Sequence, residues 1–228
     1  MITLGLDTST ARGNIALLRD DQPLAEEFFV RGGGKHVPEQ HLFGVLDKLL
    51  TDQKLTPNDI NLITVGIGPG SFTGIRVGIA AAKGLALPRQ VPIKAVGSFD
   101  ALALTALPRM PRDCPQMCVL CDARRDEIYS ALYDRDGNRV RDCTISPLEA
   151  IADEIHNPIW FVSSEIDRFT GELKEIFGGF ASVCDEPIFP SAAALGWLGH
   201  ARFIKDGKRG DTTLEPMYLR ETNYKKLW

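Results

Sequence analysis

The chain has 228 residues, of which 44% are hydrophobic and 25% charged, and this is the composition of an ordinary globular protein. Such a length suffices for one large domain or two small lobes, and excludes more. The apolar runs end well before the roughly 18 residues that a membrane span requires. The N-terminus MITLGLDTST has no signal-peptide pattern, so we expect a cytoplasmic protein with no membrane segment.

The charge pattern argues against direct nucleic-acid binding. The formal net charge is −4, and the 26 lysines and arginines are scattered along the chain instead of forming a basic stripe. A stripe of that kind is the electrostatic footprint of a phosphate-binding surface. If nucleic acid is involved, we expect another subunit to hold it.

The elements predicted for the first half of the chain follow from its apolar runs and their spacing. Residues 2–6 and 14–18 read as a hairpin, because two apolar runs flank a polar turn. A third strand is predicted at 24–30, a helix at 39–50, a strand at 59–67, a helix at 73–87, a strand at 92–96 and a helix at 99–106. Three prolines at 108, 111 and 115 then mark a linker.

The same pattern restarts after this linker. Strands are predicted at 116–121, 127–133 and 140–145, with an Asp136-Gly137 turn between the last two, and helices and strands alternate afterwards. The sequence therefore predicts an α/β protein of two similarly built lobes. We place a first lobe at residues 1–108 and a second lobe at residues 109–228.

Three of the five cysteines lie close together, which raises the possibility of a zinc site. Cys118 and Cys121 fall on a predicted strand, where residues three apart point to opposite faces, so they cannot converge with Cys114 on one metal. We therefore expect free thiols in a reducing compartment, and no metal site.

The histidines give no metal pair either. His36 and His41 are five residues apart, whereas two ligands on one helix face are four apart. His156 and His200 are isolated in the sequence.

The glycine-rich segment at 68–87, GPGSFTGIRVGIAAAKGLAL, follows a predicted strand and opens a helix, where phosphate groups often bind. It lacks the lysine of a P-loop, the third glycine of a dinucleotide fingerprint and the first glycine of a hydrolase nucleophile elbow. Ser71 is therefore expected to start the helix. Gly68, Gly70 and Ser71 remain candidates for a vestigial phosphate loop.

A second candidate phosphate site lies in the first hairpin, at Asp7, Thr8 and Ser9. In the sugar kinase, Hsp70 and actin superfamily, an acidic residue in this hairpin helps to hold magnesium while its neighbours cradle phosphate. Here the usual glycine is replaced by Thr8-Ser9, so an Asx-turn with no ligand is an equal alternative. Mixed charges at the corresponding turn of the second lobe include Arg124 and Arg125, which we expect to be solvated.

Four segments together resemble one family: LGLDTST at 4–10, GPGSFTGIRVGIAAAKGLAL at 68–87, DARRDEIY at 122–129 and PMYLR at 216–220. The family is TsaB, also called YeaZ. The resemblance implies two lobes of the actin-like ATPase superfamily. It also implies a paralogue of TsaD, which transfers a threonylcarbamoyl group to adenosine of tRNA with a metal held by an H-x-x-x-H pair.

Where that pair would fall, residues 96–102 read VGSFDAL, and both histidines are absent. The resemblance therefore implies a non-catalytic scaffold that TsaD and TsaE need, with no catalytic residue of its own and tRNA bound only through the complex. It implies a homodimer when alone and no required cofactor, and a joint interface with TsaD is the candidate site for ATP or ADP. The alternatives are a metal-dependent glycoprotease-like peptidase and a nucleotide-responsive switch protein.

The helix at 73–87 is expected to be the main docking element, because its apolar surface is wider than one neighbouring sheet can cover. The residues assigned to the partner interface are Gly74, Ile75, Gly78, Ile79 and Ala82. The resemblance implies that this helix binds TsaD or a second copy of the chain.

Overall fold

A computed structural model describes residues 1–30 and 42–220 of the chain. His36, His41 and the first part of the helix predicted at 39–50 lie outside these residues. Within them, no helix combines the length and the apolar character that crossing a membrane requires.

The first sheet is built as the sequence predicted, from a hairpin, a third strand and two parallel strands. Its strands are β1 (Ile2–Asp7), β2 (Arg12–Arg19), β3 (Gln22–Val30), β4 (Ile60–Gly66) and β5 (Ile93–Val96), in the spatial order β3-β2-β1-β4-β5. β1 pairs antiparallel with β2 and parallel with β4. β1 is central and buried along its whole length, so both of its faces must be covered by other elements.

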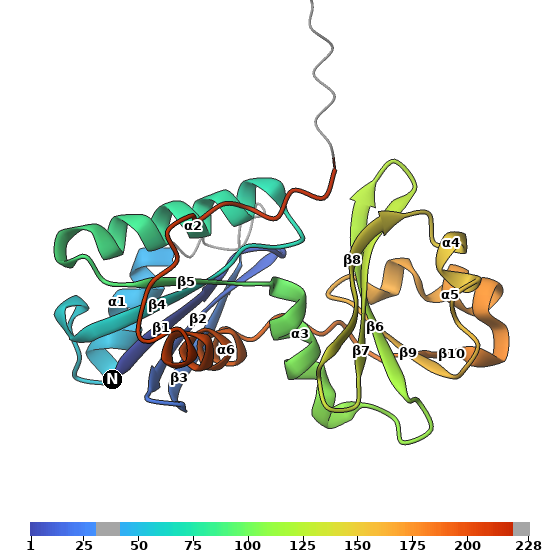
Figure 1. Cartoon of the computed structure of the whole chain (residues 1–228), viewed down its shortest axis with the longest axis horizontal. Helices are drawn as coiled ribbons and strands as arrows, with labels where there is room; N and C mark the ends of the chain where they lie inside the picture. Colours follow the sequence, from blue (N-terminus) through green and yellow to red (C-terminus); the bar gives the residue numbers. More distant parts are fainter. Residues whose placement is uncertain (31–41, 221–228) are drawn as a thin grey trace, which may run out of the picture.

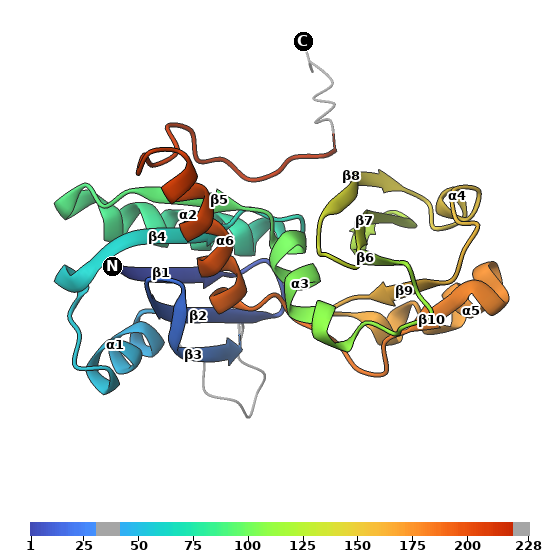
Figure 2. The same cartoon turned by 60° about the horizontal axis from the view of Figure 1, so that its bottom comes forward.

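Helices cover both faces of this sheet (Figure 1). α1 (Leu42–Asp52) and α2 (Phe72–Ala86) pack on one face, where leucines of α1 recur at the spacing of one helical side. α6 (Ala192–Lys205) crosses the other face, as Figure 2 shows. α6 lies very close to β1, because Gly5 leaves room for the backbone carbonyl of Ala192.

The second sheet repeats the first. Its strands are β6 (Gln116–Arg124), β7 (Glu127–Asp134), β8 (Arg139–Ser146), β9 (Ile159–Val162) and β10 (Ala181–Val183), in the order β10-β9-β6-β7-β8. A hairpin again leads to a third strand on one side of the central strand, and two parallel strands again lie on its other side. Gly137 has φ 80° in the predicted β7–β8 turn. The expectation of two similarly built α/β lobes is therefore confirmed.

Shorter elements complete the chain. The second sheet carries α4 (Glu149–Ala152) and α5 (Thr170–Phe177). Five 3₁₀ turns lie within the described residues: Pro57–Asp59, Leu87–Arg89, Leu107–Arg109, Ile166–Arg168 and Gly178–Phe180.

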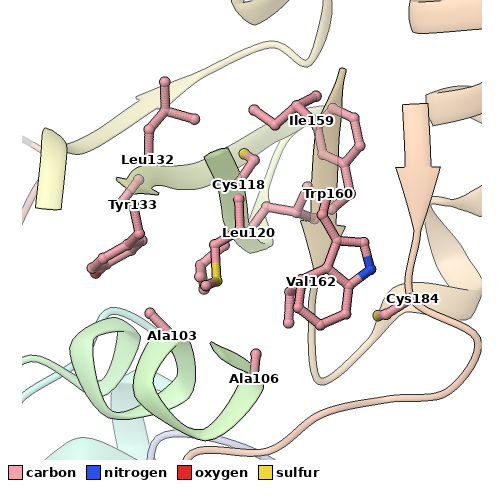
Figure 3. Packing of buried hydrophobic residues seen from close by; sticks show 14 of the residues in the cluster. Ala103, Ala106, Cys118, Leu120, Leu132, Tyr133, Ile159, Trp160, Val162 and Cys184 are labelled. Atoms are coloured by element: carbon pink, nitrogen blue, oxygen red, sulfur yellow. The ribbon is translucent and has the colours of Figure 1, made fainter. Parts of the chain in front are cut away.

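Two helices each pack against the sheet that does not precede them in the chain. α3 (Ser98–Ala106) follows β5, yet its Ala103 and Ala106 pack into the core of the second sheet with Leu120 and Trp160 (Figure 3). α6 follows β10, yet its Ala192 packs on the first sheet. The boundaries expected at 1–108 and 109–228 are therefore corrected. Below, the first lobe is β1–β5 with α1, α2 and α6, and the second lobe is β6–β10 with α3, α4 and α5.

Candidate functional site

The turn that follows β1 is buried where the two lobes meet. Asp7 is 1% exposed, and its Oδ1 accepts hydrogen bonds from the backbone N–H of Ser9 at 2.8 Å and from the Ser9 hydroxyl at 2.6 Å. Its Oδ2 accepts one from the hydroxyl of Ser98, at the start of α3, at 2.7 Å. Asp7 thus forms an Asx-turn and joins the first hairpin to α3.

The glycine-rich loop is tied to the same turn. The Ser71 N–H donates to the Ser9 carbonyl at 2.7 Å, and the Gly68 N–H donates to Ser98 Oγ at 3.1 Å. Gly70 has φ 148°, and a Cβ there would collide with the Ser9 carbonyl, so glycine is needed for the two loops to touch. Ser71 caps α2 by accepting from the Gly74 N–H at 3.2 Å, as the sequence predicted for a helix-start residue.

These bonds determine how the phosphate-loop candidates are arranged. The structure brings Asp7, Thr8, Ser9, Gly68, Gly70 and Ser71 together, because the β1–β2 turn lies against the loop between β4 and α2. The Gly68 and Ser71 N–H groups, which a phosphate would need, donate to protein oxygens, and the hydroxyl of Thr8 donates to the Gly74 carbonyl at 2.7 Å. A phosphate role for these residues stays a prediction.

A cavity of about 390 Å³ separates the glycine-rich loop from the second lobe. Hydroxyl-bearing residues Ser9, Ser71 and Ser98 line one side of it, and Asp122 and Tyr129 line the other. We call it the interlobe cavity.

Asp122 lies near the end of β6, between the buried Cys121 and Ala123, and is one of the charged residues on the second-lobe side of the interlobe cavity. It forms ion pairs with Arg168 at 2.8 Å and with Arg124 at 3.0 Å. Partial burial alone would raise the pKa of Asp122, but its hydrogen bonds to Arg168 and to the Arg124 N–H, with the charges of both arginines, hold it below its ordinary value. Asp122 is therefore a carboxylate at neutral pH, and together with Glu165, which lies 3.9 Å from Arg168, it balances the charges of the two arginines.

A second bridge between the lobes is formed by the C-terminal segment 206–220. The Met217 N–H donates to the Ile67 carbonyl at 2.8 Å on the first lobe. Arg220 then reaches the second lobe, where it pairs with Glu127 at 2.6 Å and donates to the Ala123 carbonyl at 3.1 Å. A groove of about 780 Å³ lies between this segment and the body of the protein.

Asp100 joins the lobes on the other side of α3. It accepts hydrogen bonds from Tyr133 at 2.9 Å and from Arg139 at 2.5 Å in the second lobe, and from Arg202 of α6 at 3.3 Å. Asp100 is 11% exposed, so its charge needs these partners. We call these four residues the Asp100 cluster. No sequence pattern marks Ser98 or Asp100 as a lobe contact, although both lie in the segment 96–102, where the H-x-x-x-H pair is missing.

The expected partner-interface residues are corrected by the structure. Gly74, Ile75, Gly78, Ile79 and Ala82 all face the first sheet and are buried within the lobe. The outward side of α2 carries other residues, including Phe72 at 55% exposure and Val77 at 47%, with Leu87 at 78% just beyond the helix. The periodicity showed that α2 is apolar on two sides, but it could not say which side meets the protein's own core.

The remaining candidates are placed as follows. Arg124 and Arg125 are exposed, as expected, and both have positive φ in the β6–β7 turn. All five cysteines are free thiols, and burial raises the pKa of Cys118 to about 12. Across residues 1–30 and 42–220, no three His, Cys, Asp or Glu side chains gather as metal ligands would.

Comparisons with known proteins agree with this architecture. Residues 36–170 match the family described as "TsaD: tRNA N6-adenosine threonylcarbamoyltransferase". The chain is 28% identical to "tRNA threonylcarbamoyladenosine biosynthesis protein TsaB" of Bacillus subtilis, over 100% of this chain and 98% of that protein. It is 34% identical to the Escherichia coli protein of the same name, over 61% of this chain and 58% of that protein.

Solved structures give the same result. "YeaZ from Pseudomonas aeruginosa" matches with a TM-score of 0.76 and 25% identity, covering 96% of this chain and 99% of that one. Component A of (R)-2-hydroxyglutaryl-CoA dehydratase from Acidaminococcus fermentans shares only the fold, with a TM-score of 0.51 and 10% identity. The two lobes have the actin-like ATPase fold. By its sequence and its structure, the chain belongs to the TsaD family and, within it, to the TsaB (YeaZ) group.

Proposed function

We propose that this chain acts in the synthesis of threonylcarbamoyladenosine on tRNA, as a non-catalytic partner that TsaD and TsaE require. The names of its relatives in Bacillus subtilis and Escherichia coli support a place in this pathway. We expect it to work in the cytoplasm, to form a homodimer when alone and to meet tRNA only through the complex.

The non-catalytic role is supported most directly by residues 96–102, whose polar side chains bind other parts of this protein. Where the resemblance to TsaD would place two metal-binding histidines, residues 96–102 contain no histidine, and their polar side chains are Ser98 and Asp100. Ser98 holds Asp7 and the glycine-rich loop, and Asp100 holds Tyr133, Arg139 and Arg202. The segment therefore serves to join the lobes, and its polar side chains already bond to protein partners.

The outward side of α2 is the surface that we propose for docking TsaD or, in the free protein, a second copy. Phe72, Val77 and Leu87 are large apolar side chains that are each about half exposed or more. Phe72 is held in place because the guanidinium of Arg76 lies 3.7 Å from its ring centroid. Exposed apolar surface of this kind is typical of protein interfaces. We therefore still propose α2 as the docking helix, but through Phe72, Val77 and Leu87 and not through the five buried residues that the sequence suggested.

Omission of single components from the reconstituted reaction tests the role. TsaD, TsaE, tRNA, the threonylcarbamoyl-adenylate and this chain are combined, and modified adenosine is measured after each is left out. We expect modification to stop without this chain, and the chain alone to modify no tRNA and to cleave no protein substrate. Turnover by the chain alone, or full activity without it, would contradict the proposal; protein cleavage would favour the peptidase alternative.

A pair of charge substitutions tests the docking surface. Val77→Arg should keep its melting temperature but lose binding to TsaD, because a charge would be buried in the interface. Val140→Arg is the matched control, since Val140 is 49% exposed on the second lobe. If Val77→Arg binds TsaD as well as the control does, this side of α2 is not the interface.

Nucleotide binding separates the scaffold from the switch alternative. We propose that the chain requires no cofactor and that ATP or ADP, if bound, lies at the joint interface with TsaD. Binding of ATP and magnesium to the isolated chain is measured by calorimetry. Tight binding would favour a nucleotide-responsive switch, whereas binding only with TsaD present would support the joint site.

A further inference from the structure

The last turn of α6 and the loop after it carry a local concentration of positive charge. Lys205, Lys208 and Arg209 are exposed, and none of them forms an ion pair with another residue in the described part of the chain. Two acidic residues lie in the same stretch, and both bind one buried lysine. Asp206 and Asp211 pair with the buried Lys94 at 2.6 Å and 2.8 Å. The two carboxylates of the stretch are thus engaged by Lys94, although Asp206 stays 51% exposed, while the three cations are exposed and take part in no ion pair within the described residues.

The backbone holds these cations on a defined turn. Gly207 and Lys208 have φ of 67° and 62°, and the Lys208 N–H donates to the Phe203 carbonyl at 2.8 Å. Asp211 closes the loop, because its N–H donates to the Ile93 carbonyl at 2.8 Å and its Oδ2 accepts from the Ala95 N–H at 2.7 Å. A fixed turn loses little conformational entropy when its side chains bind a partner.

Part of this charge has an ordinary explanation. Cations in the last turn of a helix balance its dipole, which accounts for Lys205. Arg202 is engaged elsewhere, since it donates to the Ala95 carbonyl at 3.2 Å and to Asp100. Lys208 and Arg209 lie beyond the helix and are not needed for that purpose.

An exposed aromatic ring lies on the same helix. Trp197 is 44% exposed, and it is separated from Lys205 by eight residues, which is about 12 Å along a helix. A length of about 12 Å corresponds to a few nucleotides, and an exposed ring beside phosphate-binding cations is typical of surfaces that bind unpaired RNA.

We infer that the outward side of α6, formed by Trp197, Lys205, Lys208 and Arg209, is a secondary contact for the tRNA backbone and one unpaired base. The inference rests on the proposed function, because it takes tRNA as the substrate of the complex. α6 covers the face of the first sheet opposite to α2, so this surface stays accessible when a protein partner binds α2 (Figure 2). Charge complementarity with phosphate distinguishes RNA from an apolar protein partner.

Three cations make few phosphate contacts, so the isolated chain should bind tRNA weakly. The contact contributes more to the tRNA affinity of the complex when another subunit already holds the tRNA, because the second contact is then intramolecular. The net charge of −4 agrees with weak binding by the chain alone.

The test measures the affinity of the complex of this chain with TsaD for a tRNA transcript, over a range of salt concentrations. The variant Lys205→Gln/Lys208→Gln/Arg209→Gln should bind more weakly, and the slope of log affinity against log salt should fall by about two, since each lost phosphate contact lowers it by about 0.7–0.9. Trp197→Ala should weaken binding roughly fivefold or more, if a base stacks on the ring.

The matched control is Lys54→Gln/Arg112→Gln/Lys174→Gln, which removes the same charge from three exposed cations on other parts of the surface. It should leave the slope within about half a unit of the unaltered complex. Equal slopes for the two triple variants would overturn the inference. So would variants that keep the tRNA affinity but lose TsaE or TsaD, since the surface would then bind protein.

Failure of this inference can be told from failure of the proposed function. If tRNA modification requires the unaltered chain but the α6 variants behave like the control, only the RNA contact is wrong. If modification does not require the chain at all, the proposed function fails, whatever the variants show.

Discussion

The two lobes have the same strand order, but the turns at their central strands are used differently. Asp7 is the last residue of β1 and Asp122 lies near the end of β6, and each accepts the N–H of the residue two positions later at 2.8 Å. The second oxygen of Asp7 meets the neutral hydroxyl of Ser98 in the interior, whereas that of Asp122 meets two arginines near the surface. Equivalent turns thus form a buried, hydrogen-bonded contact between the lobes in one case and a charged, partly exposed side of the interlobe cavity in the other.

The helix packing of the lobes differs in a related way. Aligned on these two aspartates, Gly5 of β1 corresponds to Leu120 of β6. Gly5 lets the backbone of α6 touch the strand, while Leu120 fills a wider space against the alanines of α3 (Figure 3). Each lobe is therefore completed by the helix that follows the other sheet. This exchange ties the lobes together more firmly than a single linker would, and this suits a scaffold.

The largest expected effect comes from filling the close contact of the first lobe. Gly5→Val should lower the free energy of unfolding by about 3 kcal/mol, because the new side chain meets the backbone of Ala192, which cannot move aside. Leu120→Val, at the corresponding position, should cost only about 1 kcal/mol. Thermal unfolding measures both, and equal melting temperatures would show that the lobes pack alike.

The Asp100 cluster should show how much the lobe junction depends on charge. Asp100→Asn is expected to destabilise the protein by about 2 kcal/mol, because the half-buried Arg139 loses its main counter-ion. Asp142→Asn removes the other carboxylate near Arg139, at 3.4 Å and 94% exposed, and should change the melting temperature little. Similar losses for both variants would mean that Asp100 is no more important than a surface charge.

Two glycines of α2 test which side of this helix belongs to the first lobe. Gly78→Ala should cost about 1–2 kcal/mol, since the methyl group meets the Thr8 hydroxyl beside Asp7. Gly84→Ala has no atom within 4 Å of the new methyl group, and it should stabilise the helix by up to about 1 kcal/mol. Denaturant unfolding of the pair gives the difference, and a stabilising Gly78→Ala would place the core contact of α2 elsewhere.

The smallest effect concerns a buried polar atom that one lobe has and the other lacks. Thr3 is fully buried and its hydroxyl makes no hydrogen bond, while the aligned residue of β6 is Cys118. Thr3→Val should stabilise the protein by about 1 kcal/mol, and Cys118→Ser should destabilise it by a similar amount, because each change removes or adds an unsatisfied hydroxyl. Shifts of the same sign would show that this hydroxyl has a partner.

The sequence by itself determined the secondary structure and the repeat of the two lobes. The first hairpin, the strand before the glycine-rich segment and the helix start at Ser71 all follow from patterns within a few residues. Four motifs spread along the chain also identified the family, and the comparisons confirmed it. These features are local, because backbone hydrogen bonding and turn chemistry depend on neighbouring residues.

Only the tertiary structure decided which helix covers which sheet and which side of α2 is buried. Glycine and alanine occur on both the buried and the exposed side of α2, so its periodicity could not choose a side. The exchange of α3 and α6 depends on contacts between residues far apart in the chain, such as that of the Ala192 N–H with Asn14. The roles of Ser98 and Asp100 were hidden for the same reason: a polar side chain shows its partner only when the fold brings the two together, and no local pattern encodes that distance.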